Sequence, residues 1–159
     1  MIEPGNTGAA STATDRLSID ATTADASNRA TDAATRGVRL IRRLVTMNLG
    51  LVGLQALSAG LLLSGYEGAA TMHSIGARAL LLGVLIQAVT AIVLWRRRRI
   101  PAWVVGVSIG LLLTVFLEVG LGYKRLYWLH VPIGIGIFGW LMRLTIKLDT
   151  LSSTSGTRS

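Results

Sequence analysis

The sequence contains no cysteine and only two histidines, His73 and His130. The lack of cysteine excludes disulfide bonds, thiolate metal ligands, covalent c-type haem attachment and cysteine nucleophiles. Charged residues are also scarce: they make up 15% of the chain, whereas soluble domains usually contain about 25%. The composition therefore argues against an ordinary soluble domain.

Apolar residues are abundant instead, at 51% of a 159-residue chain that is long enough for one domain. Four apolar runs each approach the ~20 residues that a helix needs to cross a ~30 Å hydrocarbon core. Backbone groups in lipid must bond internally, so these runs are expected to be helices, and their short connections favour antiparallel neighbours. We predict an all-α integral membrane protein with a four-helix up-down-up-down bundle over residues 36–148. The expected helices cover about residues 44–64, 71–95, 101–121 and 126–146.

Polar segments flank this predicted bundle. Residues 1–35 are rich in Ala, Thr, Ser and Asp and have almost no large apolar side chains. Such a segment buries too little surface to offset its ordering entropy, so we predict a disordered cytoplasmic tail. It lacks the basic and apolar regions of a secretory signal. Residues 149–159 are expected to form a polar C-terminal tail.

The net charge of +8 is placed beside the apolar runs, which is typical of membrane proteins rather than nucleic-acid-binding proteins. We therefore expect a lipid bilayer and no nucleic acid as the partner of this surface. Ten positive residues fall on one side of the predicted topology, against Lys124 and Arg125 in loops on the other. The positive-inside rule then predicts a multi-pass protein of the plasma (cytoplasmic) membrane with both termini cytoplasmic. The ten residues are Arg36, Arg39, Arg42, Arg43, Arg96, Arg97, Arg98, Arg99, Arg143 and Lys147.

Both histidines stand where an apolar run begins, in "TMHSIGARALLLG" (residues 71–83) and "YWLHVPIGIGIFG" (residues 127–139). The second and fourth helices run in the same direction, so His73 and His130 are expected at similar depth near the outer face. Imidazole is a common ligand of haem iron. Gly76 and Ala77 below His73, and Gly134 below His130, would leave room for a porphyrin. We predict non-covalent haem b with His73 and His130 as its iron ligands.

Other interpretations of these residues stay open. A histidine at a membrane boundary is also explained by solvation among the headgroups, and small residues are common packing devices in membrane helices. Another metal is a further alternative, although zinc is poorly supported without a cluster of carboxylates and histidines.

Ionisable residues inside a membrane normally face the bundle interior and find a partner. Glu118 and Arg78 fall at similar depths, so an ion pair between them is one expectation. The other places both beside the haem, where Arg78 offsets a propionate and Glu118 tunes the iron or relays protons. Lys124, Arg125 and Tyr123 are alternative propionate partners.

A short repeat accompanies the histidines. "VGLQALSAG" begins at Val52 and "VFLEVGLG" at Val115, and each precedes an outer loop and a helix headed by a histidine. Gln55 and Glu118 hold equivalent places in the repeat. Gln55 and Gln87 are also amides in mid-membrane positions, for which interhelical hydrogen bonds are expected.

This order of segments, closed by "LHVPIGIGIFG", resembles small four-helix membrane b-type cytochromes and one half of the haem A synthase family over about residues 40–147. The resemblance implies a haem held between histidines of the second and fourth helices, here His73 and His130. Haem A synthases typically have two such halves, and many have an extracellular cysteine pair. This chain has one half and neither the cysteines nor a second histidine pair, so the resemblance does not imply haem A synthesis by this chain alone.

The predicted function is one-electron transfer near the outer leaflet, with a quinone or a redox protein as partner and without a need for catalytic activity of its own. The alternative is a haem-free membrane scaffold or accessory subunit of a larger complex. A small-solute carrier is less well supported, because Pro132 is the only candidate helix break and falls early in its helix.

Overall fold

The computed structural model describes residues 7–154, with side chains for residues 21–150. Its four helices are α1 (Thr7–Leu63), α2 (Ala69–Arg96), α3 (Ala102–Tyr123) and α4 (Tyr127–Thr154), and the described residues contain no strand. All four contain a segment long and apolar enough to cross a membrane. The prediction of an all-α membrane protein with four helices is confirmed.

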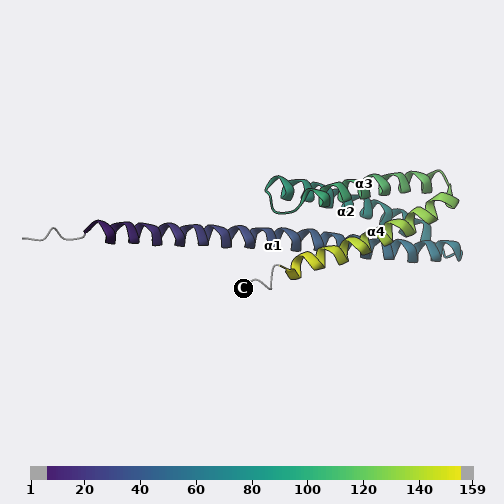
Figure 1. Ribbon diagram of the computed structural model, residues 1–159. Helices are drawn as coiled ribbons and strands as arrows, with labels where there is room; N and C mark the ends of the chain where they lie inside the picture. Colours follow the sequence, from purple (N-terminus) through teal and green to yellow (C-terminus); the bar gives the residue numbers. More distant parts are fainter. Residues whose placement is uncertain (1–6, 155–159) are drawn as a thin grey trace, which may run out of the picture.

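The helices form a ring of antiparallel neighbours (Figure 1). Helix α1 packs against α2 and α4, and α3 packs against the same two helices. Helices α2 and α4 are therefore diagonal partners that run in the same direction. This arrangement is the one that short connections favour, because a short turn returns the chain beside the helix that it leaves.

The N-terminal segment differs from the sequence expectation. Helix α1 begins at Thr7, whereas residues 1–35 were expected to be disordered, and it extends well beyond the bundle (Figure 1). Residues 9–36 contain nine alanines and neither glycine nor proline, and alanine is the best helix former. Side chains 21–32 are all exposed. Local helix propensity, rather than packing, accounts for this part of α1.

The C-terminal tail expected from residue 149 also continues a helix, because α4 extends to Thr154. Residues 1–6 and 155–159, which complete the two predicted tails, lie outside the described residues. Helix α4 also places Pro132 in its second turn, where the missing N–H leaves the carbonyl of Trp128 without its usual intrahelical donor.

The bundle buries apolar side chains along its axis and turns others outward. Val45, Val84 and Leu141 are completely buried, whereas Leu113 and Phe116 on α3 are 63% and 68% exposed. A helix that is apolar on both its inner and its outer face is suited to a lipid environment, since water does not solvate the outer face.

A polar network crosses the middle of the bundle. The Asn48 Nδ2 donates to Gln87 Oε1 at 2.9 Å, and the Gln87 Nε2 donates to Ser108 Oγ at 3.3 Å. All three side chains are fully buried and join α1, α2 and α3. The expectation of interhelical hydrogen bonds for Gln87 is confirmed. The Asn48 Oδ1 lies where a Cβ atom would stand on Gly83, so close packing here requires glycine.

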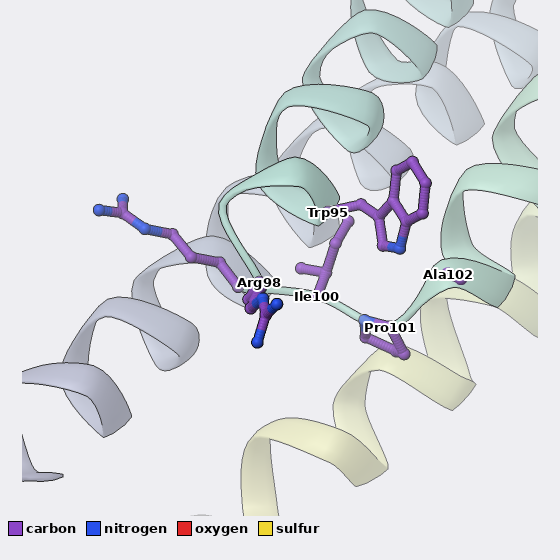
Figure 2. Close-up of a pocket in the computed structure, with 6 residues that line it drawn as sticks. Trp95, Arg98, Ile100, Pro101 and Ala102 are labelled. Carbon is purple, nitrogen blue, oxygen red and sulfur yellow. The ribbon is translucent and has the colours of Figure 1, made fainter.

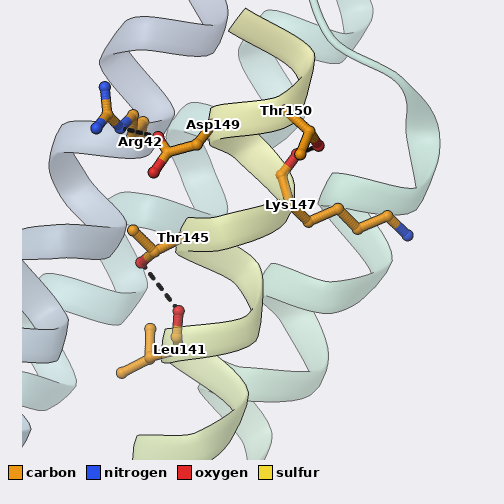
Figure 3. A network of polar contacts seen from close by, with 6 residues as sticks. All are labelled: Arg42, Leu141, Thr145, Lys147, Asp149 and Thr150. Carbon is orange, nitrogen blue, oxygen red and sulfur yellow. Dashed lines mark hydrogen bonds and ion pairs between the residues drawn. The ribbon is translucent and has the colours of Figure 1, made fainter. Parts of the chain in front are cut away.

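The ten positive residues named above gather at one end of the bundle, called the arginine end below; the opposite end is the histidine end. At the arginine end Arg42 and Asp149 form an ion pair between α1 and α4 (Figure 3). Lys147 points away from that pair, and its Nζ lies 4.3 Å from the ring centroid of Trp103 on α3. These contacts connect α4 to both of its neighbours at this end of the bundle.

Helices α2 and α3 end in the same way. The Arg99 N–H donates to the carbonyl of Leu94 and the Arg98 N–H donates to that of Trp95, which is the hydrogen-bond pattern of a Schellman motif. Arg98 adopts the left-handed conformation at φ 54°, as Arg125 does after α3 at φ 58°. Glycine usually occupies this position, because a Cβ atom costs roughly 1–2 kcal/mol there.

We predict that Gly83→Ala lowers the stability of the bundle by about 1–2 kcal/mol, because its Cβ would displace the buried Asn48 amide and break the polar network. Thermal unfolding in detergent measures the loss. Gly106→Ala is the matched control, since nothing lies within 4 Å of its Cβ position, and it should leave stability within about 0.5 kcal/mol. Equal effects of the two variants would contradict this account.

Candidate functional site: two facing histidines

The structure brings the two histidines together at the histidine end. His73 lies in the second turn of α2, and His130 lies in the first turn of its diagonal partner α4. Their ring centroids are 6.1 Å apart and the ring planes cross at 75°. Both residues are partly buried. Two imidazoles from helices without backbone contact therefore meet across the bundle.

The hydrogen bonds of His130 determine its tautomer. The Nδ1 lies 3.1 Å from the backbone carbonyl oxygen of Glu118 and 3.1 Å from its Oε1. A carbonyl oxygen only accepts hydrogen bonds, so Nδ1 carries the proton and donates it. The other ring nitrogen, Nε2, then has a free lone pair when the ring is neutral.

A hydroxyl group gives His73 the same tautomer, with the proton on Nδ1. Its Nδ1 lies 3.0 Å from Ser58 Oγ, and that hydroxyl donates to the backbone carbonyl of Gln55 at 3.0 Å. Because the single hydroxyl hydrogen is used on Gln55, Ser58 accepts from the His73 Nδ1–H. The hydrogen bonds of both rings thus use Nδ1, and each neutral ring keeps the lone pair of its Nε2.

Glycines allow the supporting side chains to approach. The Gln55 side-chain oxygen lies where a Cβ would stand on Gly76, and Glu118 Oε1 would be 3.0 Å from a Cβ on Gly134. From the sequence we expected a porphyrin in the space beside these two glycines. The structure fills it with polar side chains instead, because intramembrane polar groups turn into the bundle where small residues leave room. Ala77 is partly buried beside Gly76.

Both helical hairpins pack a polar side chain against a glycine that follows the histidine. Gln55 lies against the glycine three residues after His73, and Glu118 lies against the glycine four residues after His130. The short sequence repeat thus corresponds to equivalent positions in space. The hairpins differ in charge at this position, since a neutral amide, Gln55, stands in the first hairpin where the second has the carboxyl group of Glu118. Glu118 Oε2 is buried without a hydrogen-bond partner.

The expected ion pair between Glu118 and Arg78 is wrong. Glu118 pairs with His130, and Arg78 is exposed. The two residues do lie at similar depth. However, Arg78 follows His73 by five residues, which is a rotation of about 140° around the helix and turns it away from the interior. Lys124, Arg125 and Tyr123 are exposed around the α3–α4 turn.

Two further residues at the site, Ser58 and Gly122, were not predicted from the sequence. Ser58 lies one turn after Gln55, on the same face, and is 5% exposed. A Cβ on Gly122 would lie 3.0 Å from His130 Cε1, so this glycine sets how closely α3 approaches the ring. The repeat carries a signal for both, because "LQALSAG" and "LEVGLG" place a small or polar residue one turn after Gln55 and Glu118.

Searches against protein-family models, curated proteins and solved structures found no match to this chain. Within residues 21–150, no group of three or more His, Asp or Glu side chains comes together as a metal site. The two imidazoles and their hydrogen bonds are therefore the features of this site that bear on its chemistry.

We predict that Gly122→Ala displaces the His130 ring and leaves His73 in place, because the new methyl group meets only the former. Histidine-selective ¹⁵N labelling gives one set of NMR signals per ring, so the His130 nitrogen shifts should change more than those of His73. Gly120→Ala has open space at its Cβ position and should change neither set. Equal shifts in both variants would contradict the geometry of the site.

Proposed function

We propose that this protein is a membrane haem-b protein in which His73 and His130 are the axial ligands of one iron. The separation of their rings supports this proposal. Two metal–nitrogen bonds of about 2 Å, with about 1.1 Å from each ring nitrogen to its centroid, give a centroid separation of about 6 Å when both nitrogens lie on the line between the centroids. The observed separation is 6.1 Å.

The hydrogen bonds at Nδ1 support the same proposal. A histidine ligand usually donates its second N–H to a carboxylate, a carbonyl or another acceptor, which fixes the tautomer and the ring orientation. Glu118 serves His130 in this way, and Ser58 serves His73. The unequal acceptors would make His130 the stronger electron donor to the iron, because only its partner is a carboxylate.

The proposed chemistry is one-electron transfer, which the haem supplies when bound. The chain contributes the two ligands, a surrounding of apolar helices that excludes water, and Glu118 as a charge close to one ligand. Lys124 and Arg125, exposed at the histidine end, are the proposed propionate partners. The resemblance to small b-type cytochromes and to half of a haem A synthase agrees with this assignment.

The proposed setting follows from charge and hydropathy. The arginine end would face the cytoplasm of the plasma membrane, and the histidine end would lie near the outer leaflet. A quinone or a redox protein would exchange electrons there.

A haem-free scaffold or accessory subunit is the second candidate. The exposed part of α1 favours it, since residues 21–32 form a polar helix that contacts no other part of the bundle. A helix that is polar all round can bridge to another protein or domain. This candidate requires the two histidines to serve packing alone.

We expect protein produced with ample haem to show a Soret band and sharp reduced α and β bands. His73→Ala and His130→Ala should each abolish this low-spin spectrum, because the chain has no third histidine to replace the lost ligand. Circular dichroism checks that the helices persist in both variants. Colourless wild-type protein would contradict the haem proposal and favour the scaffold.

We also expect Glu118→Ala to weaken haem retention by about 10–100-fold and to raise the reduction potential, because the ligand loses an anionic acceptor at Nδ1. Competition with a haem-binding apoprotein and a redox titration measure the two effects. Glu67→Ala removes the same charge from the exposed α1–α2 loop and should change haem retention by less than about twofold. A similar loss in both variants would show that net charge, rather than the hydrogen bond, is responsible.

A further inference from the structure

We propose that a pocket at the arginine end binds the phosphate of an acidic phospholipid headgroup. The pocket, called the arginine pocket below, is formed by the end of α2, the α2–α3 loop and the start of α3 (Figure 2). It has a volume of about 440 Å³ and is lined by Trp95, Arg98, Arg99, Ile100, Pro101 and Ala102. This proposal does not depend on haem binding.

The loop that forms the pocket is held in place. Ile100 is 6% exposed, and its side chain belongs to the bundle core. On the α1 side, a Cβ on Gly37 would lie 3.1 Å from Arg99 Cβ and 3.3 Å from the Arg99 carbonyl oxygen. The loop therefore packs tightly on α1, and the Arg99 backbone cannot move freely. A pocket with fixed walls can select a ligand at a lower entropic cost than a flexible loop.

The charge of the pocket is not neutralised by the protein. No carboxylate lines it, and within residues 21–150 no ion pair engages Arg98 or Arg99. A second pocket at the same end, of about 370 Å³, is lined by Arg39, Arg42, Arg43 and Thr46. The local field therefore attracts an anion. Guanidinium groups bind phosphate through paired N–H donors, which gives them an advantage over a simple point charge.

The surroundings favour a lipid over free phosphate. Trp95 is 44% exposed beside the arginines, and tryptophan typically occupies the boundary between headgroups and hydrocarbon. Exposed apolar side chains, including Val93 and Val89, continue along α2 from the pocket toward the histidine end. An acidic phospholipid matches both the charged pocket and the apolar face of α2, with its phosphate at the arginines and its acyl chains along the helix. Basic pockets between membrane helices bind such headgroups.

Native mass spectrometry of the full chain in detergent, at fixed ionic strength, can test the proposal. Phosphatidylglycerol should bind wild-type protein more tightly than phosphatidylcholine does. Arg98→Gln with Arg99→Gln should weaken phosphatidylglycerol binding about tenfold, since each arginine near an acidic lipid contributes about fivefold at most. Arg96→Gln with Arg97→Gln is the matched control: it removes the same charge from exposed residues that do not line the pocket. The control should lose less than about twofold.

Equal losses in the two double variants would overturn the proposal, because a general surface charge would then explain the binding. Unchanged binding in both variants, or equal affinity for the two lipids, would also overturn it. Displacement of the lipid by inorganic phosphate at equal concentration would assign the pocket to free phosphate instead. If the Arg99 change unfolds the loop, Arg98→Gln compared with Arg97→Gln makes the same test, and about a fivefold difference between them is expected.

Discussion

The antiparallel register of α1 and α2 fixes where the polar side chains of this bundle meet. Asn48 lies against Gly83, Gln55 against Gly76, and Ser58 bonds to His73. The residue numbers of each pair have the same sum, so all three pairs belong to one register. A polar group inside a membrane has no water to satisfy it, and a shift by one residue would separate every pair at once.

The second hairpin repeats this arrangement with a different charge. Glu118 on α3 faces His130 and Gly134 on α4, in the place that Gln55 and Ser58 take on α1. Because α2 and α4 are diagonal partners, the two histidines meet across the axis, and each is oriented by the helix that precedes it. The proposed haem site would use both features: two rings that face each other across the axis, and an acceptor at the Nδ1 of each ring. A packing role for the histidines would need neither.

The two ends of the bundle are organised by different forces. At the histidine end, side-chain hydrogen bonds and close glycine contacts position two rings. At the arginine end, ten positive residues surround few carboxylates, and Asp149 forms a half-exposed ion pair with Arg42. Such a pair contributes little stability, so the fold does not depend on it. The remaining positive charge is better explained by the membrane surface and its acidic lipids than by contacts within the protein.

The sequence by itself determined the number of helices and the bounds of α2 and α3 to within about two residues. It also determined the depth of each polar side chain, because position along a helix follows directly from the rise per residue. It also indicated that Gln87 would bond between helices. It did not predict the part of α1 before about residue 44, of which residues 9–36 are rich in alanine and form helix although side chains 21–32 are all exposed. Only the tertiary structure decided the rotation of each helix and the diagonal pairing of α2 with α4. Because of this rotation and pairing, Arg78 points outward and Glu118 pairs with His130. For the same reason the centroids of the two histidine rings lie 6.1 Å apart. Depth is a property of one helix, whereas a contact between helices depends on how all four pack together.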